Sequence, residues 1–211
     1  MESNALLMDI FKPETIIIYG GLLLLLFVIF AECGLFFGFF LPGDSLLFVS
    51  GLLCDSHLSI PLWSLILLLI ISSFAGTVTG YGFGRWAKSY MRNKKENFFY
   101  KKKYLDMTKT FYRKYGMMAF ILGRFLPIFR TFIPILAGMV NIKVGKFLVY
   151  NLLGVCMWII PLVSIGYWLG NAFPNIIDYL EIIVITLILL TSIPIIISWR
   201  KNKQLVSKEK I

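Results

Sequence analysis

The sequence predicts an all-α integral membrane protein that forms a single membrane domain over residues 1–211, with about four transmembrane helices and two oppositely oriented re-entrant helical hairpins. Three observations lead to this prediction. Hydrophobic residues make up 58% of the 211 residues and charged residues only 15%, and the mean hydropathy is +0.81. Several runs are long and free of charge, and two parts of the chain repeat one motif in opposite directions.

Four apolar runs are candidate spans, since crossing a bilayer takes roughly 20 residues. They cover residues 15–31, 60–84, 147–177 and 182–199. The first run is the least even, and it leads directly to Glu32. A second interpretation stays open at this point: residues 15–41 could form one long arm of the first hairpin, which would move the N-terminus to the other side of the membrane.

Basic residues set the expected orientation. Residues 85–114 contain eleven Lys or Arg and only two acidic residues, so the positive-inside rule places this segment in the cytoplasm. The tail 200–211 is also basic, and we expect the C-terminus on the same side, with residues 171–180 outside. The net charge of +10 suits anionic membrane lipids as partners rather than nucleic acid, because the basic residues flank apolar spans.

Two segments, 32–53 and 123–140, are expected to enter the membrane and return on the side from which they came. Each contains helix-breaking residues within apolar sequence. Irregular backbone at that depth is tolerated only where it faces protein or a water-filled cavity. The predicted breaks are Pro42, Gly43, Pro127, Pro134 and Gly138.

The same series of motifs begins at each of the two predicted hairpins. Each series has Phe-Leu-Pro, then a glycine, then Gly-Tyr-x-x-Gly; the members are 40–42, Gly51 and 80–84 in the first half, and 125–127, Gly138 and 166–170 in the second. The first copy leads into the basic segment and the second into the outer loop, which predicts an inverted repeat with a binding site at its interface.

The predicted parts are repeat 1 (about 32–84), the basic loop 85–114, repeat 2 (about 115–170), a C-terminal helix over 179–199 and the tail 200–211.

Four ionisable residues lie beside the predicted breaks: Glu32 and Asp44 in the first hairpin, and Arg124 and Arg130 in the second. Charged side chains inside a membrane are costly, so they need partners, water or a ligand. The planar fork of Arg suits a phosphate group. Two interpretations stay open: the arginines bind an anionic substrate, or the four charges pair only to lock the hairpins together.

The metal-ligand inventory is small. Cys33, Cys54 and Cys156 have no CxxC spacing, and His57 is the only histidine. We therefore expect no metal and no cofactor.

At the charged residues the sequence resembles the DedA family of bacterial membrane proteins, also called the VTT or SNARE-associated-like family. The matching motifs are Glu32 with F-x-P-G-Asp44, and G-Arg124-F-x-P-x-x-Arg130-T-x-x-P-x-x-A-Gly138. The resemblance implies a multi-pass protein of the bacterial cytoplasmic membrane that transports lipids, with undecaprenyl or other polyprenyl phosphates as substrates, or phospholipids such as phosphatidylethanolamine. It also implies that Glu32 and Asp44 couple transport to protons and that Arg124 and Arg130 bind the substrate phosphate.

Three functions are compared on this basis. A flippase for a phosphate-headed lipid is the first hypothesis. A lipid phosphatase is not expected, because the lone His57 lacks a set of catalytic partners, and we therefore expect a protein that is not an enzyme. A scaffold or ion pathway, in which the charges line water without moving lipid, stays open, and so does the oligomeric state.

Overall fold

The structure is a computed structural model, and it describes residues 13–35, 41, 43–58, 60–91, 116, 118–125, 127–173 and 186. Within these residues the chain is helical and contains no strand, which confirms the predicted all-α fold. The elements are α2 (Pro13–Gly34), α3 (Gly43–Leu52), the π-helical turn η2 (Cys54–Leu58), α4 (Leu62–Met91), α6 (Met118–Leu122), the 3₁₀ turn η3 (Gly123–Phe125), α7 (Pro127–Met139) and α8 (Val144–Ala172).

Two helices are long and apolar enough to cross a membrane, judged by length and composition: Leu62–Ser89 of α4 and Val144–Ala172, which is the whole of α8. With a rise of about 1.5 Å per residue, each extends about 42 Å, more than the roughly 30 Å of bilayer hydrocarbon. They cover most of the predicted spans 60–84 and 147–177. The helix α4 also continues to Met91, so the predicted basic loop 85–114 begins inside it. Arg, Lys and Ala favour helix, and residues 85–91 contain no Gly or Pro to end it.

The predicted span 15–31 falls on α2, which is not one continuous helix. The backbone leaves the helical region at Gly21, with φ 61° and ψ −165°. Glycine adopts this conformation without a steric penalty because it has no Cβ. The apolar helix after the break, Gly21–Gly34, is shorter than a span. The kink at Gly21 divides the predicted span 15–31, and its crossing of the membrane stays a prediction. The predicted span 182–199 lies outside the described residues, apart from the helical Thr186.

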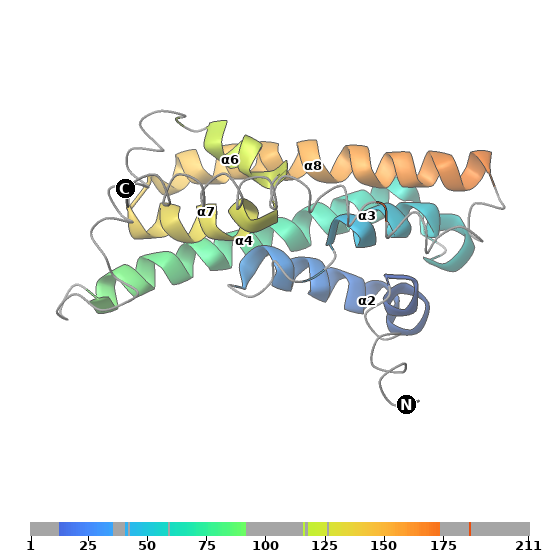
Figure 1. Cartoon of the computed structure of the whole chain (residues 1–211), viewed down its shortest axis with the longest axis horizontal. Helices are drawn as coiled ribbons and strands as arrows, with labels where there is room; N and C mark the ends of the chain where they lie inside the picture. The colour runs from blue at the N-terminus through green and yellow to red at the C-terminus, as the bar shows by residue number, and fades with distance from the viewer. Residues whose placement is uncertain are drawn as a thin grey trace, which may run out of the picture.

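The short helices α3 and α7 pack on the long helix of the opposite half of the chain. Residues of α3 contact α8, and residues of α7 contact α4 (Figure 1). Both contacts are close because glycines face backbone: a Cβ on Gly51 would lie 3.1 Å from the Tyr167 nitrogen, and one on Gly138 would lie 2.8 Å from the Arg85 nitrogen. The glycines that the sequence repeats therefore bring these helices together.

The helices α3 and α7 start in the middle of the molecule and run to opposite ends (Figure 1). The end of α7 lies beside α4 at Arg85, whereas the end of α3 lies beside Gly170 of α8, whose Cβ would be 3.3 Å from the Leu52 Cα. The hydroxyl of Tyr81, one turn before Arg85 on α4, donates to the Ile142 carbonyl at 2.6 Å, so Arg85 and Lys143 lie at the same end of the molecule. The side of the membrane that this end faces stays a prediction.

Two of the predicted helix breaks mark helix starts. Gly43 begins α3, and Pro127 begins α7, where a proline costs no hydrogen bond because the first N–H groups of a helix lack partners. Pro42 lies outside the described residues. Pro134 was expected to break the chain but lies inside α7, and Gly138 lies in its last turn. A proline removes one N–H donor, and packing on α4 keeps α7 helical around that loss.

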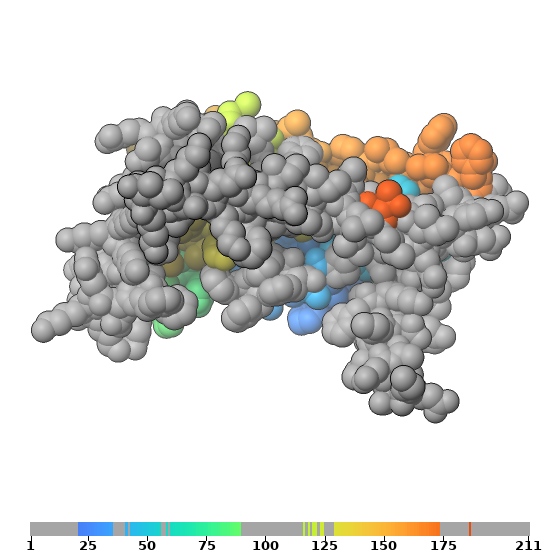
Figure 2. All heavy atoms as spheres, viewed as in Figure 1, coloured from blue at the N-terminus to red at the C-terminus, as the bar shows by residue number. Residues whose placement is uncertain are grey.

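A row of large apolar side chains is exposed along α8. Its members are Val149, Leu153, Met157, Ile160 and Trp168, each more than 40% exposed. Residues three or four positions apart share one face of a helix. Atoms of α8 also reach the surface along the upper right edge of the space-filling view (Figure 2). This face is suited to contact with lipid.

Candidate functional site

Arg130 of α7 joins the ends of two other helices. Its guanidinium forms ion pairs with Glu32 of α2 and with Asp44 of α3; the nitrogen–oxygen distance to Asp44 is 2.8 Å. The indole N–H of Trp158 on α8 donates to the same Asp44 oxygen at 2.9 Å, and the Arg130 Cζ lies 4.6 Å from the centre of the Trp158 ring. One arginine thus links α2, α3, α7 and α8.

The backbone of Gly43 completes this cluster. Its N–H donates to the Glu32 carboxylate at 3.2 Å. A Cβ at Gly43 would occupy the position of that carboxylate, so the contact requires glycine. The Glu32 side chain is fully buried and that of Asp44 is 19% exposed. We call Arg130, Glu32, Asp44 and Trp158 the Arg130 cluster.

Arg124 of η3 lies in a second cluster, whose members are neutral. Its guanidinium donates to the Asn151 Oδ1 at 2.7 Å, to the Ser73 hydroxyl at 3.2 Å and to the Thr77 hydroxyl at 3.4 Å. The amide nitrogen of Asn151 in turn donates to Thr77 at 2.7 Å. All four side chains are buried. We call Arg124, Ser73, Thr77 and Asn151 the Arg124 cluster.

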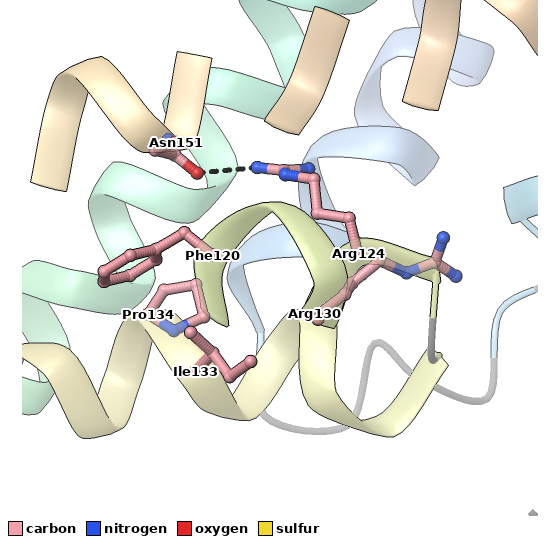
Figure 3. Close-up of a pocket in the computed structure, with 7 residues that line it drawn as sticks. Phe120, Arg124, Arg130, Ile133, Pro134 and Asn151 are labelled. Atoms are coloured by element: carbon pink, nitrogen blue, oxygen red, sulfur yellow. Dashed lines mark hydrogen bonds between the residues drawn. The ribbon is translucent and has the colours of Figure 1, made fainter. Parts of the chain in front are cut away.

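The two clusters meet at a small cavity. Its volume is about 10 Å³, and its walls are Phe120, Gly123, Arg124, Arg130, Ile133, Pro134 and Asn151. Figure 3 shows Arg124 reaching toward Asn151, while the Arg130 guanidinium points away from it. A cavity of about this size holds one water molecule. A phosphate group would fit only after the surrounding helices move apart.

The chain is similar in sequence to known membrane proteins. Residues 41–168, more than half of the chain, match the VTT domain, and this range includes most of both clusters. "Protein DedA" of Escherichia coli K12 is 31% identical over 203 residues, which cover 95% of this chain and 92% of that protein. The chain belongs to the DedA family of membrane proteins.

Two other relatives support the DedA assignment. "Inner membrane protein YqjA" of Escherichia coli K12 is 30% identical, with 87% of this chain and 86% of that protein covered. An uncharacterized membrane protein of Mycobacterium leprae is 34% identical, with 82% of this chain and 77% of that protein covered. No solved structure matches this chain. The relatives' names agree with the membrane character expected from composition.

The structure of this DedA family member brings together all four ionisable residues singled out in the sequence. It divides them unequally, however: Arg130 contacts both carboxylates, and Arg124 contacts neutral side chains in the described part of the chain. Sequence reasoning missed Asn151, Thr77 and Trp158. Asn151 carried a usable signal, because it is a lone amide in the middle of an otherwise apolar stretch.

Two polar atoms in the Arg130 cluster are buried without a hydrogen bond. Considering the described residues alone, these atoms are the Glu32 Oε2 and the Arg130 Nε. Most buried polar atoms in proteins do have a partner, so such atoms call for an explanation. Bound water or a ligand is a common partner for such atoms. Within the same described residues, no group of three or more His, Cys, Asp or Glu could hold a metal ion.

Proposed function

We propose that this DedA family member is a proton-coupled flippase for a phosphate-headed lipid, with undecaprenyl or another polyprenyl phosphate as the first substrate to test. The observation that carries the proposal is a pair of buried arginines, Arg124 and Arg130, which line one cavity in the second half of the chain and contact side chains of the first half, Glu32 and Ser73 among them. Guanidinium groups bind phosphate oxygens through charge-assisted hydrogen bonds. The proposal is transport, without covalent chemistry on the lipid.

Charge balance supports coupling to protons. With Glu32 and Asp44 ionised, their two negative charges balance the two arginines, and the buried site is neutral. A phosphate that enters with one negative charge makes the site negative, and protonation of one carboxylate restores neutrality. Because uncompensated charge in a low-dielectric interior is costly, substrate and proton are expected to bind together.

Protonation would also free Arg130. The groups facing Glu32 are Arg130, Asp44 and the Gly43 N–H, and those facing Asp44 are Arg130 and the Trp158 N–H. A neutral carboxyl holds the guanidinium less strongly than a carboxylate does. Arg130 would then turn to a phosphate that already contacts Arg124 across the cavity.

The helix contacts suggest how the site opens. The helices α2, α4 and α7 contact one another, and α3 contacts α8 through the paired glycines. Contacts of α4 with α8 and of α2 with α3 join these two groups, and so does the ion pair between Arg130 of α7 and Asp44 of α3. In this proposal the groups move apart when that pair breaks, and the cavity opens to one leaflet at a time, as in transporters built from inverted repeats.

A reconstituted flipping assay tests the proposal. Purified protein in liposomes is given a labelled polyprenyl phosphate, and its movement between leaflets is measured with and without a pH gradient. We expect flipping that the gradient accelerates, and we expect Glu32→Gln and Asp44→Asn to lose this acceleration while inserting normally. The absence of flipping would overturn the proposal in favour of a scaffold or ion pathway. Movement of labelled phosphatidylethanolamine but not of polyprenyl phosphate would replace the proposed substrate with a phospholipid.

A further inference from the structure

The amide of Asn151 holds Arg124 in place without neutralising its charge. The Thr77 hydroxyl hydrogen is directed to helix backbone, since its oxygen lies 2.9 Å from the Phe74 carbonyl and 3.0 Å from the Ser73 carbonyl. Thr77 therefore accepts the N–H of Asn151, which turns the amide oxygen toward Arg124. The orientation of the amide is fixed by its partners on both sides.

A carboxylate in this position would satisfy the guanidinium better. Charge-assisted pairs between Arg and carboxylate are stronger than bonds from Arg to a neutral amide. Asp has nearly the same shape as Asn, so the space at position 151 would accept it. Because the side chain at position 151 is neutral, Arg124 has no direct carboxylate partner among the described residues, in contrast to the two carboxylates at Arg130.

Asn151 also lies on the cavity itself, in contact with Arg124 (Figure 3), and Arg130 lines the same cavity. A head group that enters this cavity would lie within reach of the charge that Asn151 preserves. We propose that Asn151 is a specificity-determining residue, which makes the site select an anionic head group over a neutral or zwitterionic one. This inference rests on the proposed function and names the residue that sets substrate charge.

Asn151→Asp tests the inference, with Asn171→Asp as the matched control. Asn171 is on the same helix but exposed near its end, away from both clusters. Binding of polyprenyl phosphate and of the uncharged polyprenol to purified protein is measured, together with the rise in melting temperature caused by inorganic phosphate. We expect Asn151→Asp to fold with an equal or higher melting temperature and to bind polyprenyl phosphate at least about tenfold more weakly. Its binding of polyprenol should not change, and Asn171→Asp should match the wild type.

A second variant keeps the test decisive if Asn151→Asp does not fold. Thr77→Asp places a carboxylate on the α4 side of the same guanidinium at nearly the same side-chain volume, and it should weaken polyprenyl phosphate binding similarly. Unchanged binding by folded Asn151→Asp or Thr77→Asp would overturn the inference. If the wild type does not bind polyprenyl phosphate, the proposed substrate fails. In that case, inorganic phosphate still tests the role of Asn151. If phosphate raises the melting temperature of the wild type but not that of Asn151→Asp, the role is supported. If phosphate raises both melting temperatures equally, the role is overturned.

Discussion

The two buried arginines differ in how their charge is balanced. Arg130 lies between two carboxylates and against an indole ring, whereas Arg124 is held by one amide and two hydroxyl groups. Their exposure is nearly the same, 3% for Arg130 and 4% for Arg124, so burial does not distinguish them. Their partners do: Arg130 connects helices through ion pairs, whereas Arg124 connects α4 and α8 through neutral side chains.

This comparison separates the two interpretations that the sequence left open. Pairing that locks the hairpins together describes Arg130, because its ion pairs join α7 to α2 and α3. It does not describe Arg124, whose described partners carry no charge. Locking therefore describes Arg130, whereas substrate binding by Arg124 stays a proposal, and variants of the two residues are expected to behave differently.

The largest effect is expected from Arg130→Ala. It leaves the carboxylates of Glu32 and Asp44 facing each other, and Glu32 is fully buried. Breaking a buried pair by removing one partner costs about 3–5 kcal/mol, because the remaining charge is uncompensated. The free energy of unfolding, measured by titration with a denaturing detergent, should fall by this amount.

A second substitution serves as the control for Arg130→Ala. Adding Glu32→Gln removes one of the uncompensated charges, so the double variant should be more stable than Arg130→Ala alone. If Arg130→Ala is as stable as the wild type, Arg130 does not connect the helices in the way described.

A smaller effect on stability is expected from Arg124→Ala. This change leaves the amide oxygen of Asn151 without the Arg124 donor, at a cost of about 1–3 kcal/mol, while Ser73 keeps its hydrogen bond with the Cys33 thiol at 3.2 Å. It also removes a buried charge, which offsets part of that cost. The same unfolding titration should therefore show a smaller loss than for Arg130→Ala. In contrast to Arg130→Ala, adding Glu32→Gln should give no recovery; a recovery of similar size would mean that Glu32 also balances Arg124.

The sequence predicted the four ionisable residues of the site for a general physical reason. A charge in apolar sequence is costly wherever the chain folds, so its presence signals a site without knowledge of the structure. The division of the carboxylates was not predictable in this way. Arg124 and Arg130 are six residues apart, and which of them reaches Glu32 depends on how α2 and α3 pack against α7.

The repeated glycines show a similar limit. By its place in the motif, Gly80 corresponds to Gly166, but by its contacts Gly84 corresponds to Gly166. A Cβ on Gly84 would meet Ile135, three residues before Gly138. A Cβ on Gly166 would likewise meet Phe48, three residues before Gly51. The offset is about one helical turn. Motif letters identify the glycine-bearing face of each helix, whereas the side chains around it decide which turn makes the contact.

The smallest effect is expected from Trp158→Phe, which separates the two contacts that this residue makes in the Arg130 cluster. Phe keeps an aromatic ring beside the Arg130 guanidinium but lacks the N–H that binds Asp44. Asp44 is partly exposed and keeps its ion pair with Arg130, so the loss should be about 0.5–1.5 kcal/mol, typical of one hydrogen bond. The unfolding titration measures it against Trp168→Phe, a change on the same helix at a residue that is 67% exposed and is expected to cost under about 0.5 kcal/mol. A loss from Trp158→Phe as large as that from Arg130→Ala would show that the indole, rather than Arg130, holds α3 in place through Asp44.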